Sequence, residues 1–178
     1  VRPALEFLQQ ISTFSKPLIA AVEGAAVGIG TTMLLHCDLV YAADNAKFQL
    51  PFINLALVPE GGSSQLLPAM LGHQRAAELL MLGEPFEPDT ALQLGFVDEV
   101  LNADQLASRA LEQAEKLAVK APAALAATKA LMKSQQSHPL KQVLETEVGQ
   151  FAERLSSPEA QEALLAFTER REPDFSKS

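Results

Sequence analysis

The stretch from Leu18 to Ala43 constrains the fold more than any other part of the chain. It begins with Leu18–Val22, a short continuous apolar run between turn residues, which is typical of a buried strand in a parallel sheet. Three glycines follow, then Thr31–Cys37 has the pattern of a short buried helix, and Asp38–Ala43 that of a second strand. A strand, a glycine-rich turn, a helix and a strand in this order predict an α/β or α+β core.

Short strands and many helices are expected around this unit. The strands are predicted at Lys47–Leu50, Ala56–Val58 and Phe96–Leu101. The helices are predicted at Pro3–Phe14, Gln65–Leu71 with Ser63 and Ser64 as caps, Gln74–Leu82, from Glu87 to Gly95 and from Ala103 onward; Pro122 and Ser137–Pro139 divide the tail, and Ser157-Pro158-Glu159 begins the last helix. A tail of helices with apolar faces, beside only one sheet-rich region, predicts that it packs partly on another subunit.

Composition narrows the class of protein. With 178 residues, 48% of them hydrophobic, one domain with a helical extension is expected. The longest apolar runs are far shorter than the roughly 20 residues that span a bilayer, so no membrane role is indicated. A net charge of -8 argues against nucleic-acid binding. The three histidines lack paired ligand spacing, so no metal site is expected, and Cys37 lies in an apolar run typical of a buried inert thiol.

The run Val58–Ser64 offers a candidate general base. It places Glu60 beside Gly61, Gly62 and two serines, between apolar segments. This carboxylate is expected at a loop-to-helix junction, where the positive helix end keeps it ionised while apolar neighbours limit its hydration. The same residues also fit a turn with a solvated acid.

The glycine loop allows two interpretations. Gly28-Ile29-Gly30 does not continue as a dinucleotide-binding fingerprint, because Met33 stands where that pattern needs a third glycine. Glycines at a strand-to-helix turn would let a ligand approach the unpaired N–H groups of the helix, which is how an oxyanion hole is built. They would equally permit a tight turn with close packing.

Three runs together carry a family resemblance. Lys16–Gly30, Cys37–Ala42 and Pro59–Ser64, with Gly95-Phe96-Val97, resemble the crotonase (enoyl-CoA hydratase/isomerase) superfamily over nearly all of the chain. The resemblance implies an α/β fold, a spiral of ββα units, with residues 1–117 in the core and 118–178 in a C-terminal helical region that forms trimers or dimers of trimers. It also implies acyl-CoA thioester substrates, no cofactor beyond the coenzyme A of the substrate, and an oxyanion donor at the Ile29 N–H.

Two departures from the family pattern suggest the reaction. Hydratases of the family carry glutamates at the positions of Thr32 and Phe52, neither of which can transfer a proton to water. Glu60, in contrast, matches the single catalytic glutamate of the peroxisomal-type Δ3,Δ2-enoyl-CoA isomerases. One carboxylate over C2 and C4 can move the double bond, so an isomerase of fatty-acid oxidation is expected; a hydratase or other crotonase-type enzyme and a non-catalytic acyl-CoA binder are the alternatives.

The resemblance implies further positions in the site and in the whole protein. The residues expected to contact substrate are Ala26, Gly28, Phe52, Leu57 and Phe167. Arg170 and Arg171 match basic residues near the CoA phosphates in some relatives, although a solvated helix end explains them better. The family's first oxyanion donor lies upstream of Val1, so the chain is expected to lack an N-terminal third. Ser176-Lys177-Ser178 differs from the peroxisomal S-K-L signal, which makes a cytoplasmic location the default expectation.

Overall fold

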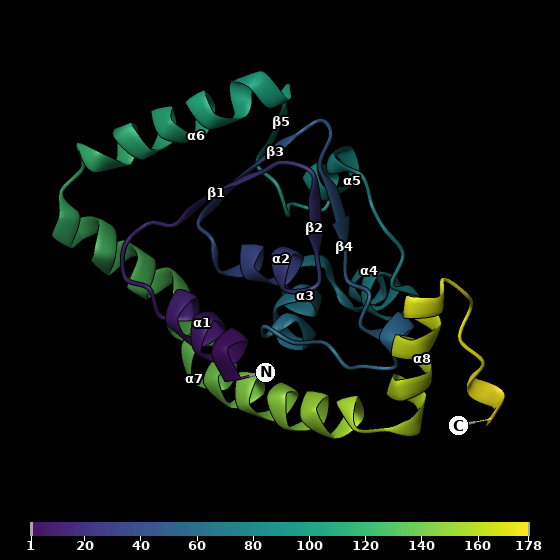
Figure 1. The fold of residues 1–178 in the computed structure, drawn as a ribbon. Coiled ribbons are helices and arrows are strands. Elements are labelled where there is room, and N and C mark those ends of the chain that lie inside the picture. Colours follow the sequence, from purple (N-terminus) through teal and green to yellow (C-terminus); the bar gives the residue numbers. More distant parts are fainter. Residues whose placement is uncertain (1, 178) are drawn as a thin grey trace.

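Two small parallel sheets form the centre of the structure, and helices lie around them (Figure 1). This computed structural model describes residues 2–177, with the backbone alone described for residues 2, 135–139 and 177. The larger sheet has the order β1-β3-β5 and the smaller one pairs β2 with β4. Their bounds are β1 Ile19–Val22, β2 Ala25–Val27, β3 Leu39–Ala43, β4 Lys47–Gln49 and β5 Glu99–Leu101. Parallel strands joined through helices agree with the predicted mixed α/β core.

Helices account for most of the remaining chain. The longest, α7, runs along one side of the molecule, with α1 against it and α8 continuing from its end (Figure 1). The α-helices are α1 Arg2–Ser12, α2 Ile29–Thr32, α3 Ser63–Leu71, α4 His73–Ala77, α5 Pro88–Gln93, α6 Ala103–Ala118, α7 Pro122–Leu155 and α8 Pro158–Glu169. The short turns are the 3-10 helices η1 Met33–His36, η2 Ile53–Leu55 and η4 Phe175–Lys177 and the π-helical turn η3 Glu78–Leu82.

Strand β3 is buried on both faces. Successive side chains of a strand point to opposite faces. Val40 and Ala42 belong to the main hydrophobic core, whereas Tyr41 and Ala43 pack with Leu106 of α6. This double burial explains why the strand is a continuous apolar run instead of an alternating pattern.

Two short segments differ from the sequence prediction. Ala25–Val27 forms strand β2, although the flanking glycines predict only a turn. Ala56–Val58, predicted as a strand, is irregular: Ala56 has a φ of 55° and follows the 3-10 helix η2. Runs of three residues carry too little periodicity to separate strand from turn, so pairing with a neighbour decides.

Helix α7 is continuous from Pro122 to Leu155, although Ser137–Pro139 predicts a break. Contacts on both sides of that segment hold the helix. Lys129 Nζ donates to Asp38 Oδ2 at 2.6 Å, and Leu140 packs in a small buried cluster with α3. Tertiary packing therefore outweighs the local preference for a break.

The remaining differences are smaller. The helix predicted at Gln74–Leu82 is α4 followed by the π-helical turn η3, and the one predicted at Thr31–Cys37 is divided between α2 and η1. None of the described helices has the length and apolarity needed to cross a membrane. Ser178, the last residue of the Ser176-Lys177-Ser178 end, lies outside the described residues.

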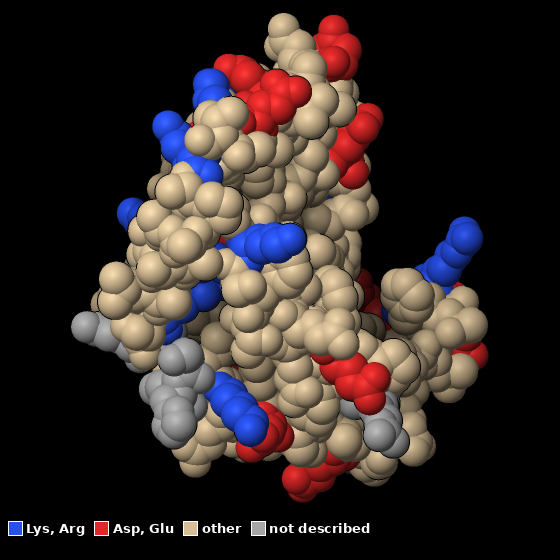
Figure 2. All heavy atoms as spheres, turned by 90° about the vertical axis from the view of Figure 1, so that its left-hand side faces the viewer, with Lys and Arg blue, Asp and Glu red and all other residues tan. Residues whose placement is uncertain are grey.

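Charges are mixed on the face formed by α6 and α7. Figure 2 shows Lys and Arg side chains interspersed with Asp and Glu side chains over a largely uncharged surface. On α6, Lys116 pairs with Glu112 at 2.6 Å, and Arg109 pairs with Glu112 and with Glu99 of β5. Exposed pairs of this kind contribute little to stability.

Candidate functional site

An apolar cavity of about 250 Å³ lies between α1, α7 and the segment that leads into α3. Helices α1 and α7 supply most of its wall. The lining residues are Ala4, Leu5, Leu8, Ile29, Phe52, Glu60, Gly61, Leu144, Val148 and Phe151. Glu60 is the one titratable side chain among these described residues, so a carboxylate faces an otherwise apolar space.

The carboxylate of Glu60 is held by a threonine. Thr32 Oγ1, which is fully buried, donates a hydrogen bond of 2.5 Å to Glu60 Oε1. Burial raises the pKa of Glu60 above its ordinary value; the Thr32 bond opposes that rise and the charge of Glu147 adds to it. A carboxylate whose pKa is raised is better suited to both accepting and returning a proton.

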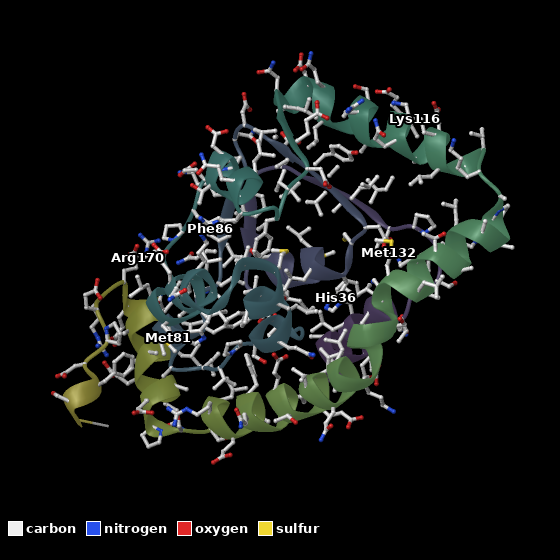
Figure 3. All side chains as sticks on the ribbon, turned by 180° about the vertical axis from the view of Figure 1, so that it is seen from behind. His36, Met81, Phe86, Lys116, Met132 and Arg170 are labelled. Atoms are coloured by element: carbon white, nitrogen blue, oxygen red, sulfur yellow. The ribbon has the colours of Figure 1, made fainter. Side chains whose placement is uncertain are left out.

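The backbone around Glu60 is held from several directions. His36 Nε2 lies 2.7 Å from Gly61 O, and since a carbonyl only accepts, Nε2 carries the proton. Burial lowers the pKa of His36, which keeps the ring neutral, and Figure 3 shows His36 in the interior. Ser63 Oγ donates to Glu60 O at 2.6 Å. Gly61 has a φ of 72°, and a Cβ there would lie 2.9 Å from Thr32 Cβ.

The start of α3 is capped from a distant helix. Glu147 of α7 is only 5% exposed; its Oε2 accepts from the Gly62 N–H at 2.6 Å, and its Oε1 accepts from the Ser64 N–H at 3.0 Å. Ser64 Oγ also donates to Glu147 Oε1 at 2.5 Å. Ser63 and Ser64 were predicted as caps, but neither caps the helix, because Gly62 occupies the N-cap position and both hydroxyls act as donors.

The glycine loop brings Ile29 to the same cavity. Gly28 has a φ of 57° and immediately precedes α2, and its carbonyl accepts from the N–H groups of Thr31 and Thr32. The N–H of Ile29 belongs to the first turn of the helix and therefore has no intrahelical acceptor. Ile29 and Glu60 both line the cavity, so the residue that begins α2 and the candidate base meet the same space.

The structure brings together three of the seven predicted site residues. Ile29, Phe52 and Glu60 line the cavity, and Gly28 turns the chain beside it. Ala26 and Leu57 lie in the hydrophobic core instead.

Phe167 lies away from the cavity, with 77% of its surface exposed. Helix α8 buries the opposite side, at Ala160, Ala163 and Ala166, so the residue next to Ala166 faces outward. Arg171 pairs with Glu162 and Glu169, and Arg170 lies at the outer end of α8 (Figure 3). These positions fit a solvated helix end.

Three residues around Glu60, namely Thr32, His36 and Glu147, were not predicted as part of the site. Thr32 stands out only as a missing glutamate, and His36 lies in an apolar run. Glu147 carries a detectable signal, because it lies on the stripe formed by Leu140, Leu144 and Phe151 at helical spacing. An acid on an apolar stripe indicates a buried, paired charge.

Comparisons with known proteins agree on the family. Residues 2–178 match the model of the family described as enoyl-CoA hydratase/isomerase. The 2,3-dehydroadipyl-CoA hydratase of Escherichia coli (strain K12) is 36% identical over 166 residues, which cover 93% of this chain and 65% of that protein. The carnitinyl-CoA dehydratase of the same strain is 34% identical over 170 residues, with coverage of 93% and 65%.

A solved structure extends the comparison to the fold. The crystal structure of an enoyl-CoA hydratase/isomerase from Pseudoalteromonas atlantica T6c superposes with a TM-score of 0.93 at 39% identity, covering 96% of this chain and 69% of that chain. The crotonase-like fold implied by the resemblance is therefore confirmed. The chain spans about 65% of the length of these two E. coli relatives. Their names describe a hydratase and a dehydratase, and neither name describes an isomerase.

Proposed function

The chain belongs to the enoyl-CoA hydratase/isomerase family, and from that premise we propose that it moves the double bond of a 3-enoyl-CoA to C2, with Glu60 as the single acid–base group. Glu60 takes a proton from C2 of the substrate. The resulting dienolate oxygen is held by backbone donors that include the Ile29 N–H. Glu60 then returns the proton to C4, so that protons balance over the reaction.

The observation that carries this proposal is the hydrogen bond of 2.5 Å from Thr32 to Glu60 in an apolar cavity. Hydration needs a group that holds and activates water, and hydratases of the family use acids at the positions of Thr32 and Phe52. Here Thr32 already donates to Glu60, and Phe52 adds only apolar surface to the cavity. One carboxylate without a second acid suits a proton shuttle between two carbons.

Hydration is the second candidate, and the names of the relatives favour it. Both E. coli proteins compared above act, by name, as a hydratase or a dehydratase on CoA thioesters. In this reading Glu60 would activate the water. A third possibility is an acyl-CoA binder that exchanges no proton.

The deciding experiment is the Glu60→Gln variant, assayed on a 3-enoyl-CoA and a 2-enoyl-CoA. Isomerisation should fall by about 10²- to 10⁴-fold, the usual contribution of a general acid–base group. Exchange of C2 protons into deuterated water should fall with it. Glu78→Gln serves as the control, because Glu78 is exposed and outside the cavity.

The outcomes separate the candidates. Wild-type turnover in Glu60→Gln would remove Glu60 as the base. Rapid addition of water to a 2-enoyl-CoA, without isomerisation, would establish the hydratase. Tight acyl-CoA binding with no C2 exchange in the unaltered protein would establish the binder.

The Glu60→Gln variant should also fold well. Because the folded pKa of Glu60 is raised above 4.5, the native state binds more protons than the unfolded state between 4.5 and that raised value. Stability contributed by this group is therefore lost as pH rises through that window. The variant should show a weaker fall in melting temperature between pH 4.5 and 8.

Several wider properties belong to the same proposal. We propose a homotrimer or dimer of trimers in which residues 118–178 form the helical region and 1–117 the core, with acyl-CoA as the substrate, no separate cofactor and a cytoplasmic location. The exposed Phe167 of α8 fits a contact in such an assembly. Sedimentation analysis of the purified protein tests the assembly.

A further inference from the structure

We propose that Glu147 is a positioning residue for Glu60: it caps α3 from helix α7 and thereby fixes the segment that carries the Glu60 carboxylate into the cavity. The proposal deepens the proposed function and rests on Glu60 acting as the acid–base group. Glu147 itself does not line the cavity, so it acts through the backbone between Gly62 and Ser64.

The geometry of Gly62 explains why the cap comes from another helix. Gly62 has a φ of 77°, a conformation that side chains rarely adopt, and a Cβ there would lie 2.5 Å from Leu140 Cδ1. A serine or aspartate at this N-cap position is therefore excluded. The N–H groups at the start of α3 have no intrahelical acceptor, and that of the buried Gly62 needs one from elsewhere in the fold.

Glu147 meets that need with both carboxylate oxygens. One oxygen accepts from Gly62, and the other accepts twice from Ser64. The bonds link residues 83 and 85 positions apart in the chain. A glutamine at this position would offer one acceptor oxygen and would turn an N–H₂ group towards one of the donors. The arrangement therefore requires the carboxylate, and not only a side chain of its size.

The charge of Glu147 also reaches Glu60. Glu147 is buried and Glu60 is half-buried, and the charge of Glu147 contributes to the raised pKa of Glu60. Helix α1 faces the cavity with Ala4, Leu5 and Leu8 only.

The other titratable groups near the segment do not place a charge on it. The turn η1 contributes the neutral His36, and Lys133 of α7 donates to the His36 carbonyl at 3.1 Å. Burial lowers the pKa of Lys133 as well. Glu147 is thus the charged side chain through which α7 acts on the segment that holds Glu60.

The test is Glu147→Gln in the purified protein, assayed on a 3-enoyl-CoA across pH. The value of kcat should fall roughly ten- to hundredfold, because a displacement of about 1 Å at a reacting group has effects of this size. KM should stay within about twofold, since the cavity wall is unchanged. The acid limb of the kcat/KM profile should move to lower pH, because removing a negative charge lowers the pKa of Glu60.

Glu145→Gln is the matched control, since it makes the same chemical change on the exposed side of the same helix. Ser64→Ala is the second variant in case Glu147→Gln does not fold. It removes one donor and keeps the charge, so kcat should fall a few-fold with the acid limb unmoved.

Each outcome either supports or overturns the proposal. An unchanged kcat in Glu147→Gln or in Ser64→Ala overturns it. A lower kcat in Glu147→Gln with an unmoved acid limb also overturns it, because a purely structural cap would give that result. If Glu60→Gln is inactive while Glu147→Gln matches the wild type, only this inference fails. If Glu60→Gln keeps full turnover, the proposed function fails first.

Discussion

Helices α3 and α8 begin in different ways, although serines stand at the start of both. At α8, Ser157 is the N-cap, and its Oγ accepts from the Ala160 N–H at 3.2 Å, as the Ser157-Pro158-Glu159 sequence predicts. At α3, Gly62 is the N-cap and Glu147 of α7 supplies the acceptors. The N-terminus of α8 is therefore capped by a residue next to it in the chain. The N-terminus of α3, beside Glu60, depends on a residue that only the tertiary fold brings near.

The pKa values of two glutamates, Glu162 in α8 and Glu60 just before α3, are shifted in opposite directions. Glu162 of α8 lies half-buried at the surface and is bonded to Arg171, which lowers its pKa from 4.5 to about 2. Glu60 is half-buried beside Thr32 in the apolar cavity, and the loss of hydration there raises its pKa. The surface stabilises the charged form, while the cavity makes the charge easier to neutralise, which is the property that proton transfer requires.

The largest effect that would break this comparison is expected from Gly62→Ala. The new methyl group would meet Leu140, and the alanine would be held at a positive φ, so the free energy of unfolding should fall by about 1–3 kcal/mol. Denaturant unfolding with a fluorescent probe or circular dichroism measures it. Gly149→Ala in α7 is the control: it meets no atom within 4 Å, and it should stabilise the helix by about 0.5–1 kcal/mol. Equal destabilisation by both changes would contradict the crowded geometry at Gly62.

A change in proton affinity is expected from Thr32→Val, which removes the donor to Glu60 at nearly constant volume. The hydrogen bond lowers the pKa of Glu60, so its loss should raise that pKa and move the acid limb of kcat/KM to higher pH. This shift is opposite to that expected for Glu147→Gln.

Thr31→Val is the control, because its Oγ1 donates to Ala26 O, away from Glu60. It should lower stability, since a buried acceptor loses its donor, and leave the acid limb in place. Identical pH profiles for Thr32→Val and the wild type would show that the Thr32 bond does not tune Glu60.

The smallest effect is expected from Ser157→Ala at the local cap of α8. Loss of an N-cap side chain costs about 1 kcal/mol of stability, and turnover should not change, because the residue is remote from the cavity. Ser156→Ala, at an exposed neighbouring position, should change stability by less than half of that. A fall in kcat for Ser157→Ala would remove the distinction between the two helix starts.

Much of the core was predictable because its patterns are local. The apolar runs at β1 and β3, the stripe of α6 and the cap of α8 all lie where the residues indicate. Strand β2 was missed and Ala56–Val58 was wrongly assigned, because runs of three residues depend on a partner strand.

The site was predictable only in part. Glu60, Ile29 and Phe52 share one cavity, whereas Ala26 and Leu57 entered the core and Phe167 faces outward. The face that a helical residue presents depends on what the rest of the helix buries, and three alanines decide this for α8.

The sequence by itself determined the α/β core, the family and the carboxylate beside two glycines, because each is written in contiguous residues. Only the tertiary structure decided what surrounds that carboxylate. Thr32 lies 28 residues before Glu60 and Glu147 lies 87 residues after it, and both act on the same short segment. Burial, the hydrogen bond from Thr32 and the charge of Glu147 shift the pKa of Glu60, and no local pattern records a contact between residues so far apart in the chain.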